Sequence, residues 1–121
     1  MESKIPLIEK NKEGYTKVRL IECLQGVELS LLRLKEGFGR NSAGKVFMAW
    51  KAFISALVVL NLDRIYRDEK EKEWYFKTGF LASTTRLKGI SQRLEDLGYN
   101  VIDLTSTALA LHRYAVANSF R

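Results

Sequence analysis

Residues 39 to 46, GRNSAGKV, come close to the phosphate-binding loop of nucleotide hydrolases. In that loop a glycine and four further residues precede Gly-Lys and a hydroxyl residue, because backbone amides cradle the phosphates and the hydroxyl binds magnesium. Gly39, Gly44 and Lys45 match the first three fixed positions, but Val46 stands where the hydroxyl is required. The segment before the loop also has helical periodicity, whereas a strand must feed such a loop. The sequence therefore argues against a nucleotide hydrolase.

The same stretch keeps the features of a simple anion site at the start of a helix. Free amides at a helix N-terminus attract anions, and Arg40, Ser42 and Lys45 add two positive charges and a hydroxyl. Asn41 or Ser42 is suited to cap the helix, because its side-chain oxygen can accept from an amide one turn in. We predict anion or nucleic-acid binding by Arg40, Ser42 and Lys45. An ordinary capped helix with solvated basic side chains is the alternative.

His112 is the only histidine, so any mechanism that needs an imidazole must use it. It lies in the last predicted helix beside Arg113 and Tyr114, and these three residues form the candidate catalytic group. A lone histidine in such a helix is also commonly a packed, hydrogen-bonded group. No second histidine or carboxylate cluster accompanies it at helical spacing, and Cys23 is the only cysteine. We therefore predict no metal site, no cofactor and no disulfide.

Lys51 interrupts the most apolar segment of the chain. A buried ammonium group is costly unless it is paired or neutral. Lys51 and Glu28 are predicted as buried polar residues, and Glu28 and Asp103 are the possible partners of Lys51. The alternative is that Lys51 extends its methylenes to the rim of the fold and keeps its charge in water.

The elements that must position these residues have helical periodicity. From residue 16 to 38, apolar side chains recur at spacings of four and three, which predicts one buried helix face. They are Leu20, Leu24, Val27, Leu31, Leu34 and Phe38. Residues 43 to 65 are apolar on nearly every side, which is typical of a helix at the centre of a bundle.

The remaining segments are predicted as shorter elements. Residues 63 to 73 form a dense charge run, typical of an exposed helix end and loop, and residues 74 to 83 a short helix. Thr84 or Thr85 starts an amphipathic segment with Gly98 as its C-cap, and residues 102 to 120 form the last helix. No strand alternation or internal repeat is visible. The fold class predicted is all-α, an up-and-down bundle of four or five helices at residues 16 to 121, behind a polar arm at residues 1 to 15.

Composition limits the partners. The 20 Lys and Arg against 14 Asp and Glu give a formal charge of +6, which favours a polyanion or an acidic protein surface. The longest apolar run, residues 46 to 60, is interrupted by Lys51 and Ser55 and is shorter than the roughly 20 residues that span a bilayer. We predict a cytoplasmic protein with no membrane segment.

Two segments carry a resemblance to a known family: AGKVFMAWKAFISAL, after a polar, glycine-bearing helix start, and ALALHRYAVANSF in the terminal helix. They resemble the small archaeal helical proteins of the PaREP type, which look related to the HEPN domains. The resemblance covers about residues 16 to 120. It implies a helical bundle, commonly a homodimer, often associated with a nucleotidyltransferase partner in toxin systems or with RNA cleavage.

Active ribonucleases of the HEPN class carry an arginine, four to six residues and then a histidine on a late helix. Counting back from His112, the arginine position falls on Thr105, Ser106 or Thr107. None of these can supply a cation to a cleaved phosphate. The leading hypothesis is a non-enzymatic HEPN-like homodimer, pairing near its small-residue terminal helix and binding RNA, nucleotide or a partner protein through a basic face. The alternative is a degenerate, metal-independent ribonuclease that uses the His112 region.

Overall fold

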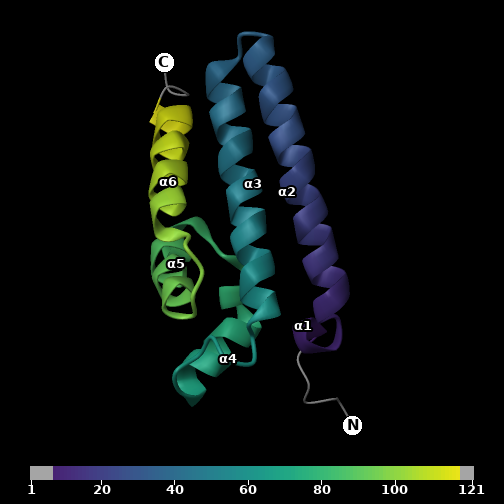
Figure 1. The fold of residues 1–121 in the computed structure, drawn as a ribbon, viewed down its shortest axis with the longest axis vertical. Coiled ribbons are helices and arrows are strands. Elements are labelled where there is room, and N and C mark those ends of the chain that lie inside the picture. Colours follow the sequence, from purple (N-terminus) through teal and green to yellow (C-terminus); the bar gives the residue numbers. More distant parts are fainter. Residues whose placement is uncertain (1–6, 118–121) are drawn as a thin grey trace.

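The fold was obtained as a computed structural model, which describes residues 7 to 117. The predicted all-α bundle is confirmed, since this part of the chain contains helices and turns and no strand. Two long antiparallel helices, α2 and α3, form a hairpin, and α6 lies along the other side of α3 (Figure 1). The α-helices are α1 (Leu7–Lys10), α2 (Lys12–Lys35), α3 (Gly39–Leu60), α4 (Glu69–Lys77), α5 (Leu87–Asp96) and α6 (Ile102–Ala117); the short 3-10 helices are η1 (Gly79–Leu81) and η2 (Thr84–Arg86).

The helix α3 is the centre of the bundle, as its composition predicts. Ile54, Val58 and Val59 are fully buried, because α2, α6, α5 and η1 all pack against α3. It is also the one described helix long and apolar enough to cross a membrane, a property that the core helix of a bundle shares. The predicted boundaries at residues 43 and 65 are wrong: α3 begins at Gly39 and gives way at Asn61 to turns that lead to α4.

The predicted cap of α3 is also wrong. Phe38 is the N-cap, without a side-chain hydrogen bond, and Gly37 takes the left-handed conformation (φ 87°) that makes the turn from α2 possible. Ser42 lies in the first turn of α3 and is buried. Its hydroxyl donates to the carbonyl oxygen of Ser30 at 2.8 Å and lies 3.1 Å from the Ser30 hydroxyl. Ser42 therefore ties α3 to α2 and does not cap the helix.

The helix α2 begins four residues before its predicted start at Thr16. The part of the predicted polar arm that the structure describes, residues 7 to 15, is mostly helical, and Ile8 of α1 is buried in the core. Residues 1 to 6 of the arm and the predicted end of the last helix at residues 118 to 120 lie outside the described residues. The first turns of the hairpin therefore belong to the packed domain.

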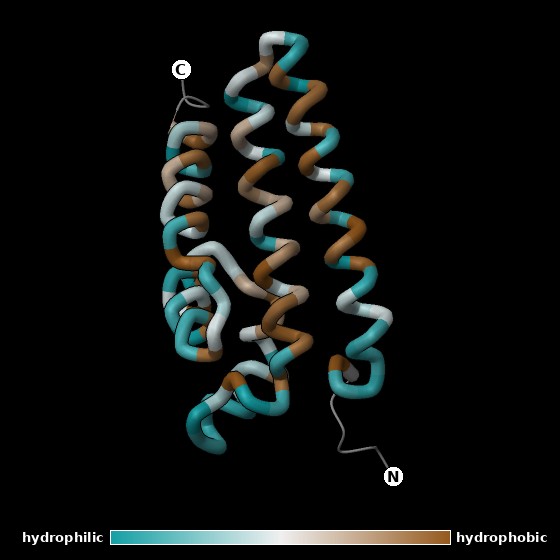
Figure 2. The backbone as a smooth tube through the Cα atoms, in the orientation of Figure 1, coloured by the Kyte–Doolittle hydropathy of each residue, from teal (hydrophilic) through white to brown (hydrophobic). Residues whose placement is uncertain are grey.

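The predicted buried face of α2 is wrong, and this is the largest difference between sequence and structure. The leucine stripe, defined as Leu20, Leu24, Val27, Leu31, Leu34 and Phe38, is exposed, at 39 to 66% of each residue's surface. Figure 2 shows hydrophobic positions recurring along α2 after its hydrophilic first turns. The face of α2 that packs on α3 lies one position before the stripe along the sequence. It consists of small or polar residues: Thr16, Cys23, Gly26 and Ser30. Successive residues differ by about 100° around a helix, so the stripe lies beside this seam.

Small side chains explain why α2 packs on α3 through this face. A Cβ atom added to Gly26 would stand 2.9 Å from the Cβ of Ala49, so the two backbones approach more closely than a leucine would permit. The hydroxyls of Ser30 and Ser42 meet in the same interface. Close approach lets α2 and α3 pack along their length, and it leaves the leucines directed away from the chain's own core.

Only the second half of the charge run is helical, since residues 63 to 68 lie in turns and irregular backbone. Glu69 to Glu73 make up the first half of α4, because the Asp68 side chain caps the helix by accepting from the Glu71 amide at 2.8 Å. The predicted C-cap at Gly98 is confirmed: its φ is 107°, and the Tyr99 amide donates back to the Leu94 carbonyl. The Glu95 carboxylate then accepts from the amides of Val101 and Ile102 at the start of α6.

Candidate functional site

Packing of α3 on α6 brings two predicted groups of site residues to the same end of the bundle. The His112 ring stacks on the Phe47 ring, with 4.2 Å between centroids and 23° between planes. The Tyr114 hydroxyl lies 3.6 Å from where a Cβ atom would stand on Gly39, and Ala115 faces Gly44. The residues predicted to bind an anion, at the start of α3, therefore lie beside those predicted to be catalytic, near the end of α6.

His112 occupies a packed position. Its ring is half-buried against the fully covered Phe47, and no hydrogen bond joins it to any other residue in the range 7 to 117. A general base needs hydrogen-bond contact with its proton donor and a partner that orients it. Arg113 follows His112 on the exposed side of α6. His112 is therefore packed, as the alternative from the sequence expects, but within the described residues it lacks the hydrogen bond that this alternative includes.

The prediction of Lys51 and Glu28 as buried polar residues is wrong. Glu28 is exposed on α2, and the described residues contain no ion pair of Lys51 with any carboxylate. The Lys51 ammonium nitrogen instead lies 5.7 Å from the centre of the Phe47 ring, where the negative face of the ring attracts it. Lys51 is half-buried, so its charge is still hydrated at the rim.

Of the three predicted anion-binding residues, Ser42 does not face the site, because its hydroxyl is used by Ser30. Arg40 is exposed and Lys45 is half-buried in the first two turns of α3. With the exposed Arg113 of α6 they form what we call the basic end of the bundle. Neither Arg40 nor Lys45 forms an ion pair with another described residue, so both charges are open to an anion.

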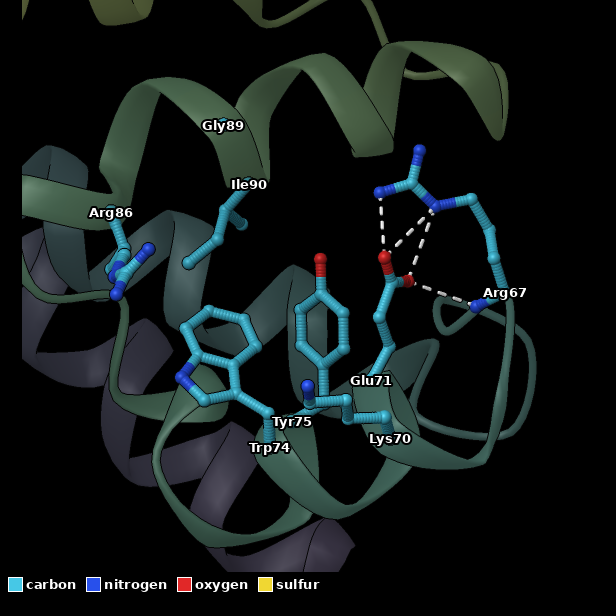
Figure 3. A pocket seen from close by; sticks show the side chains of 8 residues that line it. All are labelled: Arg67, Lys70, Glu71, Trp74, Tyr75, Arg86, Gly89 and Ile90. Atoms are coloured by element: carbon cyan, nitrogen blue, oxygen red, sulfur yellow. Dashed lines mark hydrogen bonds and ion pairs between the residues drawn. The ribbon is translucent and has the colours of Figure 1, made fainter.

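Sequence reasoning missed a cleft of about 420 Å³ between α4 and α5. Figure 3 shows its eight lining residues: Arg67, Lys70, Glu71, Trp74, Tyr75, Arg86, Gly89 and Ile90. The signal was the sequence KEKEWYF, which places cations beside two aromatic rings at helical spacing. The prediction of an exposed helix end and loop at residues 63 to 73 places the start of the helix too late, so it does not put the charged and aromatic side chains on one helix.

One side of the cleft is closed by an ion pair. The Arg67 guanidinium makes three hydrogen bonds to the two Glu71 carboxylate oxygens, at distances down to 2.7 Å, and the Arg67 amide adds a fourth at 3.0 Å. These hydrogen bonds lower the pKa of Glu71 below its ordinary value. Burial raises the pKa of the neighbouring Tyr75 hydroxyl. The tyrosine is therefore a neutral hydroxyl at physiological pH.

The lowered pKa of Glu71 predicts a pH dependence of stability. A carboxylate whose folded pKa is depressed contributes stability above its unfolded pKa, and that contribution disappears as pH falls through the folded value. We expect the free energy of unfolding, measured by urea denaturation, to fall more steeply below about pH 4 in the wild type than in Glu71→Gln. The difference will be small because the pair is near the surface. Identical pH profiles for the two proteins would contradict this assignment.

One buried central helix, with helices packed on both sides of it, defines an all-α helical bundle. Within that class, the chain belongs to the Archaeal PaREP1/PaREP8 family, whose family model matches residues 18–120. Comparisons with curated proteins and with solved structures give no match. The family match covers the hairpin, the cleft and the basic end alike.

Proposed function

We propose that this protein is a non-enzymatic, HEPN-like helical module that pairs as a homodimer and binds RNA through its basic end. The observation that carries the proposal is the exposed leucine stripe on α2. Six apolar side chains at alternating spacings of four and three are the pattern by which helices pair in coiled coils. Within the described residues, α3 is the one long helix packed along α2, and it contacts the neighbouring face.

The size of the stripe supports pairing with a second copy. Its six residues are each 39 to 66% exposed and together leave on the order of 600 Å² of apolar surface open. This area is at the upper end of the range of about 300 to 600 Å² for the largest apolar patch on a typical monomer. A standard interface buries about 800 Å² on each partner. Leu20 and Leu60 line one groove at the end of the hairpin, and Leu60, at 57% exposed, extends the apolar area. A twofold dimer supplies a matching apolar surface without requiring another protein.

The small residues of α6, where pairing was expected from the sequence, are partly used inside the chain. Ala108 is buried, and Ala115 faces Gly44 of α3. Small residues permit close backbone approach, and here that approach joins α6 to α3. The pairing surface that we propose is therefore the leucine stripe of α2.

RNA is the proposed ligand of the basic end because RNA is a polyanion and the chain carries a formal net charge of +6. Arg40 and Lys45 lie at the N-terminus of α3, where free amides favour anions. Arg113 adds an exposed charge on α6. Cleavage is not part of the proposal, because Thr105 is buried at one of the positions where a ribonuclease arginine would stand and His112 is stacked on Phe47.

The test is the salt dependence of binding to a fluorescently labelled single-stranded RNA, measured by anisotropy. Each lost phosphate contact lowers the slope of log affinity against log salt by about 0.7. In the triple variant, Arg40, Lys45 and Arg113 are all changed to glutamine. We expect this variant to lower the slope by about 2 and to weaken binding at low salt.

The matched control changes Lys12, Lys17 and Lys88 to glutamine, which removes the same charge at other places in the fold. Equal losses in the two triple variants would show unspecific attraction and overturn the assignment to the basic end. Undetectable binding by the wild type at low salt would overturn RNA binding itself. RNA cleavage by the wild type that is lost in His112→Ala would replace this proposal with the ribonuclease alternative.

A further inference from the structure

A groove of about 350 Å³ lies between the start of α2 and the end of α3. We call it the hairpin groove; it is lined by the apolar Leu20, Val59 and Leu60 and by the charged Lys12, Glu13 and Lys17. We propose that Phe38 of a second copy fills the hairpin groove, which makes the dimer antiparallel along α2. This inference rests on the proposed pairing through the leucine stripe, and it adds the orientation of the pair and the residue that each copy contributes to the other.

The spacing of the leucine stripe reads the same in both directions along α2. Its six residues are separated by 4, 3, 4, 3 and 4 positions, so the pattern is symmetric about residue 29. In an antiparallel pair centred there, Leu20 faces Phe38 of the partner subunit. Leu24 likewise faces Leu34 of the partner subunit. An antiparallel twofold pair therefore brings apolar positions together along the whole stripe.

The two ends of the stripe are complementary in shape. Phe38 is the one aromatic residue of the six, and it is 56% exposed at the turn between α2 and α3. At the other end Leu20 lines the hairpin groove, and Lys17 and Glu13 continue the line of the stripe into it at spacings of three and four. Figure 1 shows this turn and the start of α2 at opposite ends of the hairpin. The antiparallel pair therefore places each Phe38 ring at the other copy's groove.

The lining of the hairpin groove suits an aromatic ring. Val59 is fully buried and Leu60 is 57% exposed, so the end of α3 offers apolar surface for contact. Lys12 and Lys17 form no ion pair with any residue from 7 to 117. An ammonium group is attracted to the face of an aromatic ring, and the methylenes of a lysine cover apolar surface. A phenyl ring uses both parts of this lining.

The area of the interface also favours use of the groove. The stripe alone exposes on the order of 600 Å², which is less than the roughly 800 Å² that each partner buries in a standard interface. Docking of Phe38 covers the walls of the groove, including the exposed part of Leu60. The groove and the stripe together therefore approach the area of a stable dimer.

A parallel pair would leave these features unused. Phe38 would face its own copy, and the two hairpin grooves would lie at the same end of the dimer without an occupant. The basic ends would also lie together, with Arg40 and Lys45 of each copy near the same charges of the other. Like charges repel each other, whereas the antiparallel pair separates the two basic ends by the length of the hairpin.

Disulfide cross-linking tests the orientation. Leu24→Cys and Leu34→Cys are prepared as separate proteins, each with Cys23→Ser so that no native thiol takes part. A disulfide forms only where the two Cα atoms come within about 7 Å. We expect cross-linked dimers on a non-reducing gel only after the two proteins are mixed, allowed to exchange subunits and oxidised, because each new cysteine faces the other position in the antiparallel pair.

The other outcomes separate this inference from the proposed pairing. Cross-linking of each protein alone would indicate a parallel pair and overturn the inference. No cross-linking in samples that have the mass of a dimer by light scattering would show that another surface pairs, which overturns it as well. A single-chain mass would refute the proposed pairing itself, and the inference with it.

A double-mutant cycle tests the contact between Phe38 and the groove. Within one chain Phe38 and Leu60 lie at opposite ends of α3, about 33 Å apart at 1.5 Å per residue, so their effects on one chain are independent. We expect Phe38→Ala to raise the dimer Kd about tenfold or more, because a buried aromatic side chain is lost. The double variant Phe38→Ala/Leu60→Ala should fall short of the product of the two single effects by about threefold or more, since the two residues touch across the dimer.

Sedimentation equilibrium measures these dissociation constants, and circular dichroism checks that each variant is folded. The matched control is Leu81→Ala: Leu81 is 49% exposed on η1, away from the hairpin groove, so its replacement should leave the Kd unchanged. Single effects that multiply in the double variant, or an effect of Phe38→Ala no larger than that of Leu81→Ala, would overturn the inference.

Discussion

Changing Leu24 and Leu31 together to glutamate is expected to turn the dimer into a folded monomer. Both side chains lie on the leucine stripe and are exposed in the single chain, at 66% and 58%, so their replacement removes little from the chain's own core. In the proposed dimer they become buried, and burial of a leucine is worth about 1.5 to 3 kcal/mol. Two such losses on each protomer should weaken pairing by more than about a hundredfold. Sedimentation velocity measures the effect.

The chain contains a closely matched control. Leu104 on α6 is 57% exposed, almost the same as Leu31, but it lies on a different helix from the stripe. Leu104→Glu should keep the wild-type sedimentation coefficient, and circular dichroism should show all three proteins folded. If the double variant sediments as the wild type does, or if Leu104→Glu separates the protomers as effectively, the stripe is not the interface.

Thr105→Val is expected to destabilise the fold by about 1 to 3 kcal/mol, because it leaves the buried Ser91 hydroxyl and the half-buried Trp50 indole nitrogen without this partner. The Thr105 hydroxyl accepts from the Trp50 indole nitrogen of α3 at 2.8 Å and shares a hydrogen bond with the Ser91 hydroxyl of α5 at 2.7 Å. Thr105 and Ser91 are both almost fully buried. This group therefore links α3, α5 and α6, and valine keeps the shape of the side chain while removing the link.

Chemical denaturation of the two threonine variants measures the difference. Thr107, two residues further along α6, is exposed, so Thr107→Val should change stability by no more than about 0.5 kcal/mol. Because the protein is expected to be a dimer, the comparison must be made at equal protomer concentration. A Thr105→Val protein as stable as Thr107→Val would show that the three-helix hydrogen-bond group contributes little to the fold.

The sequence predicts the central helix correctly because α3 is apolar on nearly every side, a property that does not depend on register. The helix α2 was harder to interpret. On α2, two sets of residues one position apart both recur at spacings of three and four. The sequence-based prediction assigns the buried face to the more hydrophobic set. The close contact between Gly26 and Ala49 selects the other set. Periodicity shows that a helix has an apolar face, but it does not show whether that face packs in the chain's own core.

The candidate site residues also differ in how far the sequence alone can identify them. Residue type alone identifies Arg40, Lys45 and His112 as candidates, and they come to one end of the bundle because α6 packs along α3, with the His112 ring stacked on Phe47. Ser42 was misplaced, because its hydroxyl has a nearer partner in Ser30. The cleft depends on the contact between Trp74 and Arg86, which belong to two different helices, α4 and η2. Such pairings between separate elements leave no periodic signal in the sequence.

The central claim is that a second copy of the chain covers the leucine stripe. Multi-angle light scattering over a dilution series of the wild-type protein tests it most directly. We predict a molar mass of twice the chain's 13.9 kDa that falls toward the single-chain value only on strong dilution. A mass of one chain at every concentration, up to the highest that can be reached, would contradict the account.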